Sequence, residues 1–263
     1  MHEREAERHG LRYMYVPIDL DRLELPGDYL GGMVRYARLL GFRGLNITHP
    51  CKQAVLEHLD EVVPVAAAVG AVNTVVFEAG RAVGHNTDVY GFEQSLHRGL
   101  PGASLRKVVI LGAGGAGSAV AHAILGLGAS QIVVIDPLAD RLARLVESLA
   151  RRFDRSRFAV SSPDGLEGNL RSATGLVNAT PIGMAARPGV PLPTTLLRRE
   201  LWVADIVYLP LETEFLRAAR DVGCRTLNGG GMAVFQASAA FELFTGLSTD
   251  TAHMLEDFAE LVT

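Results

Sequence analysis

The stretch Val108-Val109-Ile110-Leu111-Gly112-Ala113-Gly114-Gly115-Ala116-Gly117-Ser118-Ala119-Val120 decides which fold the sequence predicts. Its four leading apolar residues predict a strand that is buried on both faces of a parallel sheet. Gly112, Gly114 and Gly117 follow at GxGxxG spacing. The first glycine permits a tight turn, the second lets a pyrophosphate approach the backbone, and the third lets a helix pack closely on the strand. The N-terminus of that helix offers unpaired N–H groups to phosphate, so the stretch predicts a dinucleotide-binding turn.

An acidic residue lies at the expected distance from this turn. A second apolar strand, Gln131–Ile135, ends at Asp136, which stands 24 positions after Gly112. A carboxylate there binds the ribose hydroxyls of the adenosine half and repels a 2′-phosphate, so we expect NAD rather than NADP. The alternative is a glycine turn in another kind of α/β unit, with Asp136 as a helix cap.

Charge and hydropathy exclude several classes of partner. The 263 residues carry 25 Lys and Arg against 29 Asp and Glu, a formal net charge of −4. This balance predicts no binding to nucleic acid or to an anionic membrane. No apolar run is long enough to span a bilayer, and the chain opens on polar residues, so we expect neither a membrane span nor a leader segment.

Cysteine and histidine content bears on compartment and metal binding. Two cysteines, Cys51 and Cys224, do not make a disulfide framework, which fits a reducing cytoplasm. The eight histidines show no paired metal-ligand spacing. We therefore expect a cytoplasmic protein, monomeric or homodimeric, that holds no metal.

Short strands and helices are predicted before the glycine turn. The spacing of apolar residues predicts helices over 29–40 and 51–62. Residues 2–9 are polar and helix-tolerant up to a stop at Gly10, and a further helix is predicted over 89–97. Strands are predicted over 12–19 and 45–48, and a hairpin over 71–77 and 82–85. The loop Gly99-Leu100-Pro101-Gly102 then predicts a domain boundary.

Strands and helices alternate after the glycine turn. Further strands are predicted over 158–160, 175–178, 203–207 and 225–227, with a helix over 212–222. This alternation predicts an α/β fold with a doubly wound parallel sheet. The apolar helix over 233–244 lies beyond this unit, and we expect it to pack back on the first domain. The predicted domains are 1–98, completed by helices within 231–263, and 99–230.

Polar side chains interrupt the apolar surroundings of the first domain. Asn46 and Thr48 alternate along one short strand and share a face. The cluster continues with Lys52, Asn73, Thr74, Asn86, Thr87 and Asp88. Such groups are costly to bury unless they are hydrogen-bonded, and a polyhydroxylated ligand would satisfy them. The alternative, that each asparagine or threonine caps a turn, explains any one of them as well.

The motifs of the chain, in their order, resemble those of shikimate dehydrogenases. They are Asn46-Ile-Thr-His-Pro-Cys-Lys52, Gly70-Ala-Val-Asn-Thr74, Gly84-His-Asn-Thr-Asp88, the Gly112–Gly117 turn, Asn178-Ala-Thr-Pro-Ile-Gly-Met184, Asp205-Ile-Val-Tyr208, and Gly231-Met232 with Gln236. The resemblance covers essentially the whole chain. It is greatest to the quinate/shikimate branch that uses NAD, because Asp136 stands where NADP-dependent members usually carry Asn-Arg-Thr. It implies a Rossmann-type sheet, a discontinuous α/β substrate-binding domain, and a place in the chorismate pathway of aromatic amino acid biosynthesis.

The resemblance implies that Lys52 and Asp88 are the catalytic pair. Oxidation of a ring hydroxyl to 3-dehydroshikimate or 3-dehydroquinate removes a hydride to the nicotinamide and a proton from the hydroxyl, and a lysine amine can take that proton. Asp88 would orient the lysine and bind a ring hydroxyl. Without the motif, a solvated lysine at a helix start is the simpler explanation of Lys52. The implied substrate-binding residues are Asn46, Thr48, Lys52, Asn73, Asp88, Tyr208 and Gln236.

The resemblance also implies which residues surround the cofactor. The glycine turn and Asp136 bind the pyrophosphate and the adenosine, while Thr180, Gly183 and Gly230 border the nicotinamide. Arg141 either lies along the adenine or is a surface charge of its helix. The implied set is Gly112, Ala113, Gly114, Gly115, Ala116, Gly117, Asp136, Arg141, Thr180, Gly183, Ile206, Val207 and Gly230.

The start of the chain departs from the family pattern. Members begin with a strand and a Ser-x-Ser or Ser-x-Thr motif whose hydroxyls hold the substrate carboxylate, whereas Met1-His2 aligns with the end of that segment. The sequence therefore predicts NAD binding with poor oxidation of quinate and shikimate, and full activity once an upstream segment is added. Two alternatives remain: an NAD-binding relative without turnover, and an enzyme resembling methylene-tetrahydrofolate dehydrogenase. The Lys52/Asp88 pair disfavours the second.

Overall fold

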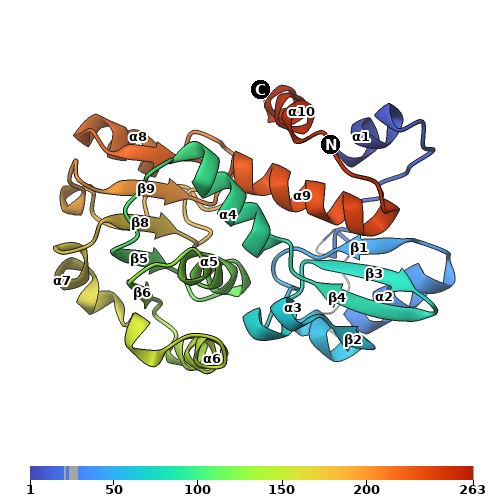
Figure 1. The fold of residues 1–263 in the computed structure, drawn as a ribbon, viewed down its shortest axis with the longest axis horizontal. Helices are drawn as coiled ribbons and strands as arrows, with labels where there is room; N and C mark the ends of the chain where they lie inside the picture. Colours follow the sequence, from blue (N-terminus) through green and yellow to red (C-terminus); the bar gives the residue numbers. More distant parts are fainter. Residues whose placement is uncertain (21, 24–28, 263) are drawn as a thin grey trace.

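The computed structural model describes residues 1–20, 22–23 and 29–262, and it arranges the described strands in two sheets (Figure 1). The α-helices are α1 (His2–Arg8), α2 (Leu30–Leu39), α3 (Pro64–Val69), α4 (Asp88–Gly99), α5 (Gly115–Gly126), α6 (Ala139–Ala150), α7 (Leu166–Leu170), α8 (Glu214–Val222), α9 (Gly230–Thr245) and α10 (Thr251–Val262). The strands are β1 (Gly44–Asn46), β2 (Glu61–Val62), β3 (Thr74–Glu78), β4 (Arg81–His85), β5 (Lys107–Leu111), β6 (Gln131–Ile135), β7 (Phe158–Ser161), β8 (Gly175–Asn178), β9 (Trp202–Asp205) and β10 (Arg225–Leu227). Short 3-10 turns include η2 (Ala54–His58), η3 (Arg155–Arg157), η4 (Pro163–Gly165) and η5 (Thr194–Leu196).

The larger sheet is the one that the glycine turn predicts. Its six strands run in the order β10-β9-β8-β5-β6-β7, and every neighbouring pair is parallel. The order reverses between β8 and β5, which is the switch point of a doubly wound sheet. The predicted fold class is confirmed.

Both faces of this sheet are buried under helices. Val108 and Ile110 of β5 belong to the apolar cluster under α4, α5 and α6, whereas Val109 and Leu111 belong to the cluster under α7 and α8. Neighbouring residues of a strand point to opposite faces, so an unbroken apolar run fits a sheet that is covered on both sides.

The smaller sheet has four strands in the order β1-β3-β4-β2. The hairpin of β3 and β4 is antiparallel, as predicted, and Ala79 and Gly80 make its turn at positive φ. β1 pairs with β3 antiparallel, and β2 pairs with β4 parallel. Val55, Val72 and Val75 lie in the cluster that this sheet forms with α2 and η2.

The strand predicted over residues 12–19 is wrong. This segment has no regular secondary structure where it is described, and Met14, Val16 and Ile18 are exposed. An alternating pattern predicts a strand only if a neighbouring strand is there to pair with it. Here the Tyr15 N–H donates instead to a carboxylate oxygen of Glu3 at 2.9 Å.

The single helix predicted over 51–62 is also wrong. The chain forms η2, then the two residues of β2, and only then α3, which begins at Pro64. Proline is favoured at the first helical position, and it forces the residue before it out of the helical region. Val63 accordingly has an extended ψ of 152°.

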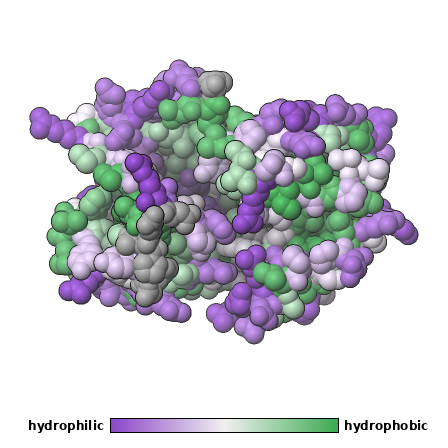
Figure 2. All heavy atoms as spheres, turned by 180° about the vertical axis from the view of Figure 1, so that it is seen from behind, coloured by the Kyte–Doolittle hydropathy of each residue, from purple (hydrophilic) through white to green (hydrophobic). Residues whose placement is uncertain are grey.

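Helices α4 and α9 pack side by side near the middle of the molecule, and α9 extends from there over the four-stranded sheet (Figure 1). Their backbones approach closely at Gly91, where a Cβ would lie 2.8 Å from the Met232 carbonyl oxygen. Met232 packs into the core of the six-stranded sheet, whereas Phe244 at the other end of α9 packs on Val76 of β3. Because α9 contacts both halves, the predicted domain bounds of 1–98 with 231–263, and 99–230, stay a prediction. From behind, the surface is hollowed between these halves (Figure 2).

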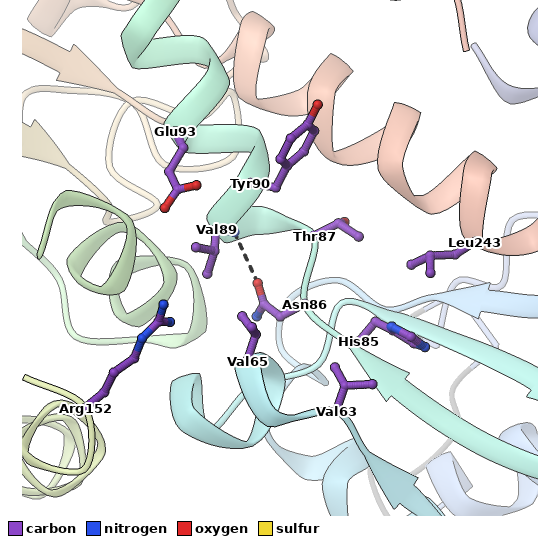
Figure 3. Close-up of a pocket in the computed structure, with 10 residues that line it drawn as sticks. All are labelled: Val63, Val65, His85, Asn86, Thr87, Val89, Tyr90, Glu93, Arg152 and Leu243. Carbon is purple, nitrogen blue, oxygen red and sulfur yellow. Dashed lines mark hydrogen bonds between the residues drawn. The ribbon is translucent and has the colours of Figure 1, made fainter. Parts of the chain in front are cut away.

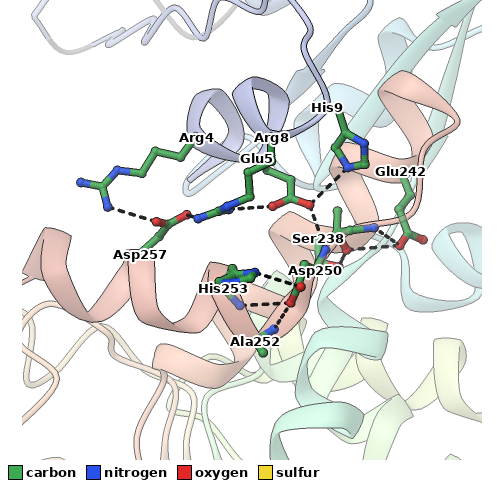
Figure 4. A network of polar contacts seen from close by, with 11 residues as sticks. Arg4, Glu5, Arg8, His9, Ser238, Glu242, Asp250, Ala252, His253 and Asp257 are labelled. Carbon is green, nitrogen blue, oxygen red and sulfur yellow. Dashed lines mark hydrogen bonds and ion pairs between the residues drawn. The ribbon is translucent and has the colours of Figure 1, made fainter.

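The two ends of the chain are joined by ion pairs (Figure 4). Arg4 and Arg8 of α1 both contact the Asp257 carboxylate of α10, at 3.1 and 2.8 Å. Glu5 is buried, and it accepts hydrogen bonds from Arg8 and from the Asp250 backbone N–H. These contacts hold α1 against the C-terminal helices.

The described part of the chain has neither a membrane-spanning helix nor a cluster of metal-ligating side chains. None of its helices is long and apolar enough to cross a membrane. No group of three or more His, Cys, Asp and Glu side chains in it lies in a position to hold a metal ion.

Burial of two histidines predicts how stability depends on pH. Burial lowers the pKa of His2 and of His122 to about 4. The unfolded chain takes up these protons near pH 6.5, so the free energy of unfolding should fall as the pH drops from about 6.5 towards 4. We expect His122 to account for about 2 kcal/mol of this loss at pH 5. Asp205 acts in the opposite direction, because burial raises its pKa to about 6.

Urea unfolding at pH 7 and pH 5 tests this expectation, with His122→Gln as the variant. The variant should lose less stability between the two pH values than the unchanged protein. Equal losses would contradict the assignment to His122.

Candidate active site

Lys52 and Asp88 form an ion pair at the junction of the two halves. The Lys52 Nζ lies 2.6 Å from the Asp88 Oδ2. The Lys52 side chain is 18% exposed and the Asp88 side chain 5% exposed, so the lysine is the more accessible member of the pair. Asp88 begins α4, where a negative charge is favoured by the helix dipole.

Asn73 ties this pair to the neighbouring elements. Its Nδ2 donates to the second carboxylate oxygen of Asp88 and to the Thr87 hydroxyl, both at 2.9 Å. Its Oδ1 accepts from the Thr87 backbone N–H at 2.8 Å and from the Thr74 hydroxyl at 3.1 Å. Asn73 is 2% exposed, and a buried amide with every group bonded holds its neighbours in fixed positions.

Asn46 and Gln236 join the same network, as the resemblance implies. Gln236 of α9 accepts a longer bond of 3.4 Å from Asn73 Nδ2. Asn46 donates to the Thr74 hydroxyl at 3.4 Å, and its Oδ1 accepts from the Tyr15 hydroxyl at 3.1 Å. The structure therefore brings together Lys52, Asp88, Asn73, Asn46 and Gln236.

Tyr15 is a residue of this site that sequence reasoning missed. It lies in the segment wrongly predicted as a strand, and it reaches Asn46 only because that segment folds back over the site. The His2 ring stacks on the Tyr15 ring with 5.0 Å between centroids. A tyrosine two positions from another tyrosine gave no signal of this role.

Among the described residues, two of the predicted substrate residues form no hydrogen bond with the network, and their roles stay predictions. Thr48 is exposed, two residues beyond the end of β1. Tyr208 is 44% exposed, and its ring lies 6.3 Å from that of Phe258.

The glycine turn has the shape that a pyrophosphate needs. Gly112 has a φ of +97°, and a Cβ at Gly117 would lie 2.0 Å from the Gly112 carbonyl oxygen. A Cβ at Gly114 would meet nothing within 4 Å, so the space beside this backbone is open. Ala113, Gly115 and Ala116 complete the turn and begin α5. These residues fit the phosphates of a dinucleotide.

Gly115 brings the two predicted sites together. A Cβ on Gly115 would lie 3.4 Å from the Lys52 Cβ and 3.5 Å from the Ala71 Cβ. The Ser118 hydroxyl of α5 donates to the Val69 carbonyl at the end of α3, at 2.7 Å. The start of α5 is thus packed against the segment that carries Lys52.

Asp136 is buried beside the glycine turn. One carboxylate oxygen accepts from the Ala113 N–H and the other from the Leu138 N–H, both at 2.8 Å. Arg141, on α6, lies 3.9 Å from the same carboxylate and is 45% exposed. Asp136 therefore faces the turn with a fixed negative charge. The exposed Arg141 side chain can lie near this carboxylate or extend into solvent.

The segments predicted to border the nicotinamide follow β8 and β9. Asn178 Oδ1 accepts from both the N–H and the hydroxyl of Thr180, and the Ile206 N–H donates to the Asn178 carbonyl at 3.0 Å. Gly183 has a φ of +107°. The carbonyl of Val207 accepts from the Gly229 N–H, which places the start of α9 at Gly230 beside this segment. Asp205, which is 1% exposed, lies between the segments that follow β8 and β9.

A separate groove of about 340 Å³ opens beside the loop that joins β4 to α4 (Figure 3). Figure 3 shows Glu93 and Arg152 at one end of it and His85 towards the other. Burial raises the pKa of Glu93 and lowers that of His85. Asn86 and Thr87 of the polar cluster line this groove, but none of the substrate or cofactor residues that the family resemblance implies does, so we do not assign it to the active site.

Sequence profiles of known families match both halves of the chain. The profile of the shikimate dehydrogenase substrate binding domain matches residues 1–75. The profile of the saccharopine dehydrogenase NADP binding domain matches residues 108–186.

Similarity to individual proteins extends over nearly the full length. The shikimate dehydrogenase (NADP(+)) of Streptomyces avermitilis is 62% identical over 261 residues, which cover 99% of this chain and 90% of that protein. The chain belongs to the shikimate dehydrogenase family. Members of this family are oxidoreductases that act on a CH–OH group, and so is this chain.

A second branch of the shikimate dehydrogenase family is also similar. The quinate/shikimate dehydrogenase (NAD(+)) of Corynebacterium glutamicum is 45% identical, over 99% of this chain and 93% of that protein. The structure of the quinate dehydrogenase from that organism in complex with NAD has a TM-score of 0.90, with 98% of this chain and 92% of that chain covered. The relatives thus support a nicotinamide cofactor and divide between NADP and NAD.

Gly114→Ala should weaken dinucleotide binding without disturbing the fold. The new methyl group meets no protein atom within 4 Å and the φ of −76° is ordinary, but the methyl group would occupy the space left for the pyrophosphate. We expect the dissociation constant of the dinucleotide to rise by about tenfold or more, which corresponds to about 1.4 kcal/mol.

Gly168→Ala is the matched control, because a Cβ there also meets nothing within 4 Å. Isothermal titration of both variants gives the comparison. If Gly114→Ala binds the dinucleotide as tightly as Gly168→Ala, the pyrophosphate does not bind at the glycine turn.

Proposed function

We propose that the chain is an NAD-dependent dehydrogenase that interconverts a ring hydroxyl of shikimate or quinate with the corresponding ketone. The observation that carries this proposal is the Lys52–Asp88 pair of 2.6 Å packed against Gly115 at the start of α5. This contact puts an amine suited to proton transfer next to the turn that fits a dinucleotide. A bound nicotinamide accepts or returns the hydride.

Lys52 is the proton carrier in this proposal. In the oxidation direction its uncharged amine accepts the proton of the substrate hydroxyl as the C–H bond breaks. In the reverse direction the ammonium returns the proton to the ketone oxygen. Asp88 holds the amine in place, and Asn73 fixes the other oxygen of that carboxylate, so Asp88 need not itself gain a proton.

The rarity of lysine supports an amine-specific role. The chain has only two lysines, Lys52 and Lys107, among its 25 basic residues. Arginine is therefore the ordinary basic residue of this protein, and its guanidinium cannot release a proton near neutral pH. Lysine at position 52 fits a task that requires the proton to leave.

The amides around the pair suit a polyhydroxylated ring. Asn46 of β1 and Gln236 of α9 offer donors and acceptors, and hydroxyl groups can pair with both, while Asn73 holds the surrounding groups in place. Such a set fixes the orientation of a ring rather than merely its presence. Shikimate and quinate both carry several adjacent hydroxyls, so the set fits either one.

Asp136 favours NAD as the cofactor. Its carboxylate is held by two backbone N–H groups, so it cannot turn away from a 2′-phosphate placed beside it. Arg141 is a nearby cation that could attract that phosphate, and it already lies 3.9 Å from Asp136. The balance of a fixed buried carboxylate against an exposed arginine supports NAD.

Steady-state assays of shikimate and quinate with NAD and with NADP test the proposal. Reduction of NAD by at least one of the two substrates is expected. Binding of NAD without any turnover would instead support the second candidate, a dinucleotide-binding relative that is not an enzyme for these acids.

Lys52→Arg should lower kcat by about 10²- to 10⁴-fold, because the guanidinium keeps the charge beside Asp88 but cannot accept the proton. Lys52→Met should have an equally low kcat, and NAD affinity should change little in both. Lys107→Arg is the control, since Lys107 bonds Asn169 and Ser172 at the other end of β5. An arginine variant of Lys52 that keeps most of its turnover would show that only the ion pair matters.

Asp136→Asn should narrow the preference for NAD over NADP by about tenfold or more, because the charge that repels the 2′-phosphate is gone. Arg141→Ala should widen the preference if Arg141 holds the phosphate of bound NADP. The ratio of kcat/KM for the two cofactors measures both effects. A protein that uses NADP better than NAD before any substitution would refute the cofactor assignment.

A further inference from the structure

Asp205 is a buried carboxylate whose hydrogen-bond partners are all uncharged. Oδ1 accepts from Asn178 Nδ2 at 3.0 Å and from the Val207 N–H at 3.1 Å. Oδ2 accepts from the Thr213 hydroxyl at 2.8 Å. Removing a carboxylate from water without a cation is costly, and the burial raises the pKa of Asp205 to about 6. A feature that costs stability calls for an explanation in function.

Only a short side chain with two acceptors suits this position. The Thr213 oxygen already accepts from the Leu216 N–H, so the Thr213 hydroxyl hydrogen points to Asp205. Asn178 and Val207 present donors to the other oxygen. An asparagine at 205 would turn an N–H₂ group towards one of these donors, which an ionised aspartate avoids.

The three partners come from separate segments at one edge of the six-stranded sheet. Asn178 ends β8 and carries the loop of Thr180 and Gly183, and a Cβ at Gly183 would lie 3.7 Å from Asp205 Oδ2. Val207 is the second residue after the end of β9. Thr213 is the N-cap of α8. The carboxylate therefore joins the loop after β8, the segment after β9 and the start of α8.

The backbone around Asp205 has further bonds that depend on this arrangement. The Ile206 N–H donates to the Asn178 carbonyl, and the Gly229 N–H donates to the Val207 carbonyl. The Asn178 amide also donates to the Ile182 carbonyl at 2.9 Å. A shift of the carboxylate would move both segments that are predicted to border the nicotinamide.

We propose that Asp205 is a positioning residue for the nicotinamide half of the cofactor: it fixes the loop after β8 and the segment after β9 at the spacing that the ring requires. This inference deepens the proposed function and rests on it. Asp205 touches neither substrate nor cofactor in this account. Its effect reaches the reaction through Thr180, Gly183, Ile206 and Val207.

The test compares a ligand that has the nicotinamide with one that lacks it. Asp205→Asn should weaken NADH binding by about tenfold, since roughly one buried hydrogen bond to a charged group is lost, and leave ADP-ribose binding within about twofold. The value of kcat should fall together with the NADH affinity, because a small misplacement of the reacting nicotinamide ring has a large effect on rate. The KM for shikimate or quinate should stay unchanged, since the residues that bind the ring lie elsewhere.

Thr213 provides variants that leave the carboxylate in place. Thr213→Val removes the hydroxyl and should reproduce the selective loss of NADH affinity in weaker form. Thr213→Ser keeps the hydroxyl and should behave as the unchanged protein. Asp257→Asn is the matched control, since it alters another buried carboxylate that joins the chain ends, and it should lower Tm without changing the ratio of NADH to ADP-ribose affinity.

Two results would overturn the inference. Equal losses of NADH and ADP-ribose affinity in the Asp205 and Thr213 variants would mean that the carboxylate merely supports the fold. Unchanged NADH affinity and kcat in both variants would mean that the spacing does not depend on it. An unchanged protein that binds ADP-ribose but neither NADH nor NADPH would instead refute the proposed function itself.

Discussion

The buried carboxylate of Asp88 is the contact on which the arrangement of the site depends. One oxygen is bound by the Lys52 amine and the other by the Asn73 amide, so three separate segments of chain must meet at this point. A buried carboxylate that loses a partner is costly, and none of the three segments can move without that cost. Asp88 also begins α4, which crosses α9 at Gly91 and so brings Gln236 to the same network.

Small residues then allow the nucleotide-binding half to approach this network. A Cβ on Gly115 would already be in van der Waals contact with Lys52 and Ala71, and a Cβ on Gly117 would collide with the Gly112 carbonyl. Hydroxyl groups of Ser118 and Ser148 satisfy the last carbonyls of α3, which belongs to the other half. The lack of a side chain at Gly115 and the hydrogen bonds of Ser118 and Ser148 to α3 together set the distance between the halves.

The parts of the fold that follow from local pattern were predictable. The apolar runs of β5 and β6, the glycine turn and the hairpin of β3 and β4 depend on residues close in sequence. The strand expected over 12–19 failed because a strand also needs a neighbour, which its own sequence does not specify. The helix expected over 51–62 failed because Leu59 is extended and Glu61 and Val62 pair with β4, a neighbour that their own sequence does not specify. The short helix α7 was missed because its five residues leave too little pattern to detect.

The residues of the candidate site also divide into those that a sequence motif predicts and those that only the folded chain reveals. Lys52, Asn73, Asp88 and Gln236 stand in motifs, and the structure brings them together. Tyr15 has no motif, and it meets Asn46 only through the path of the folded chain. Asp205 was part of a motif, but its function depends on three partners from different segments, which spacing alone does not reveal.

A crystal structure of the protein with NADH and shikimate would test the central claim most directly. The account predicts a ring hydroxyl within about 3.2 Å of the Lys52 Nζ, with the pyrophosphate against Gly114 and the nicotinamide between Gly183 and Val207. Shikimate bound away from Lys52, for example in the groove between His85 and Arg152, would contradict it.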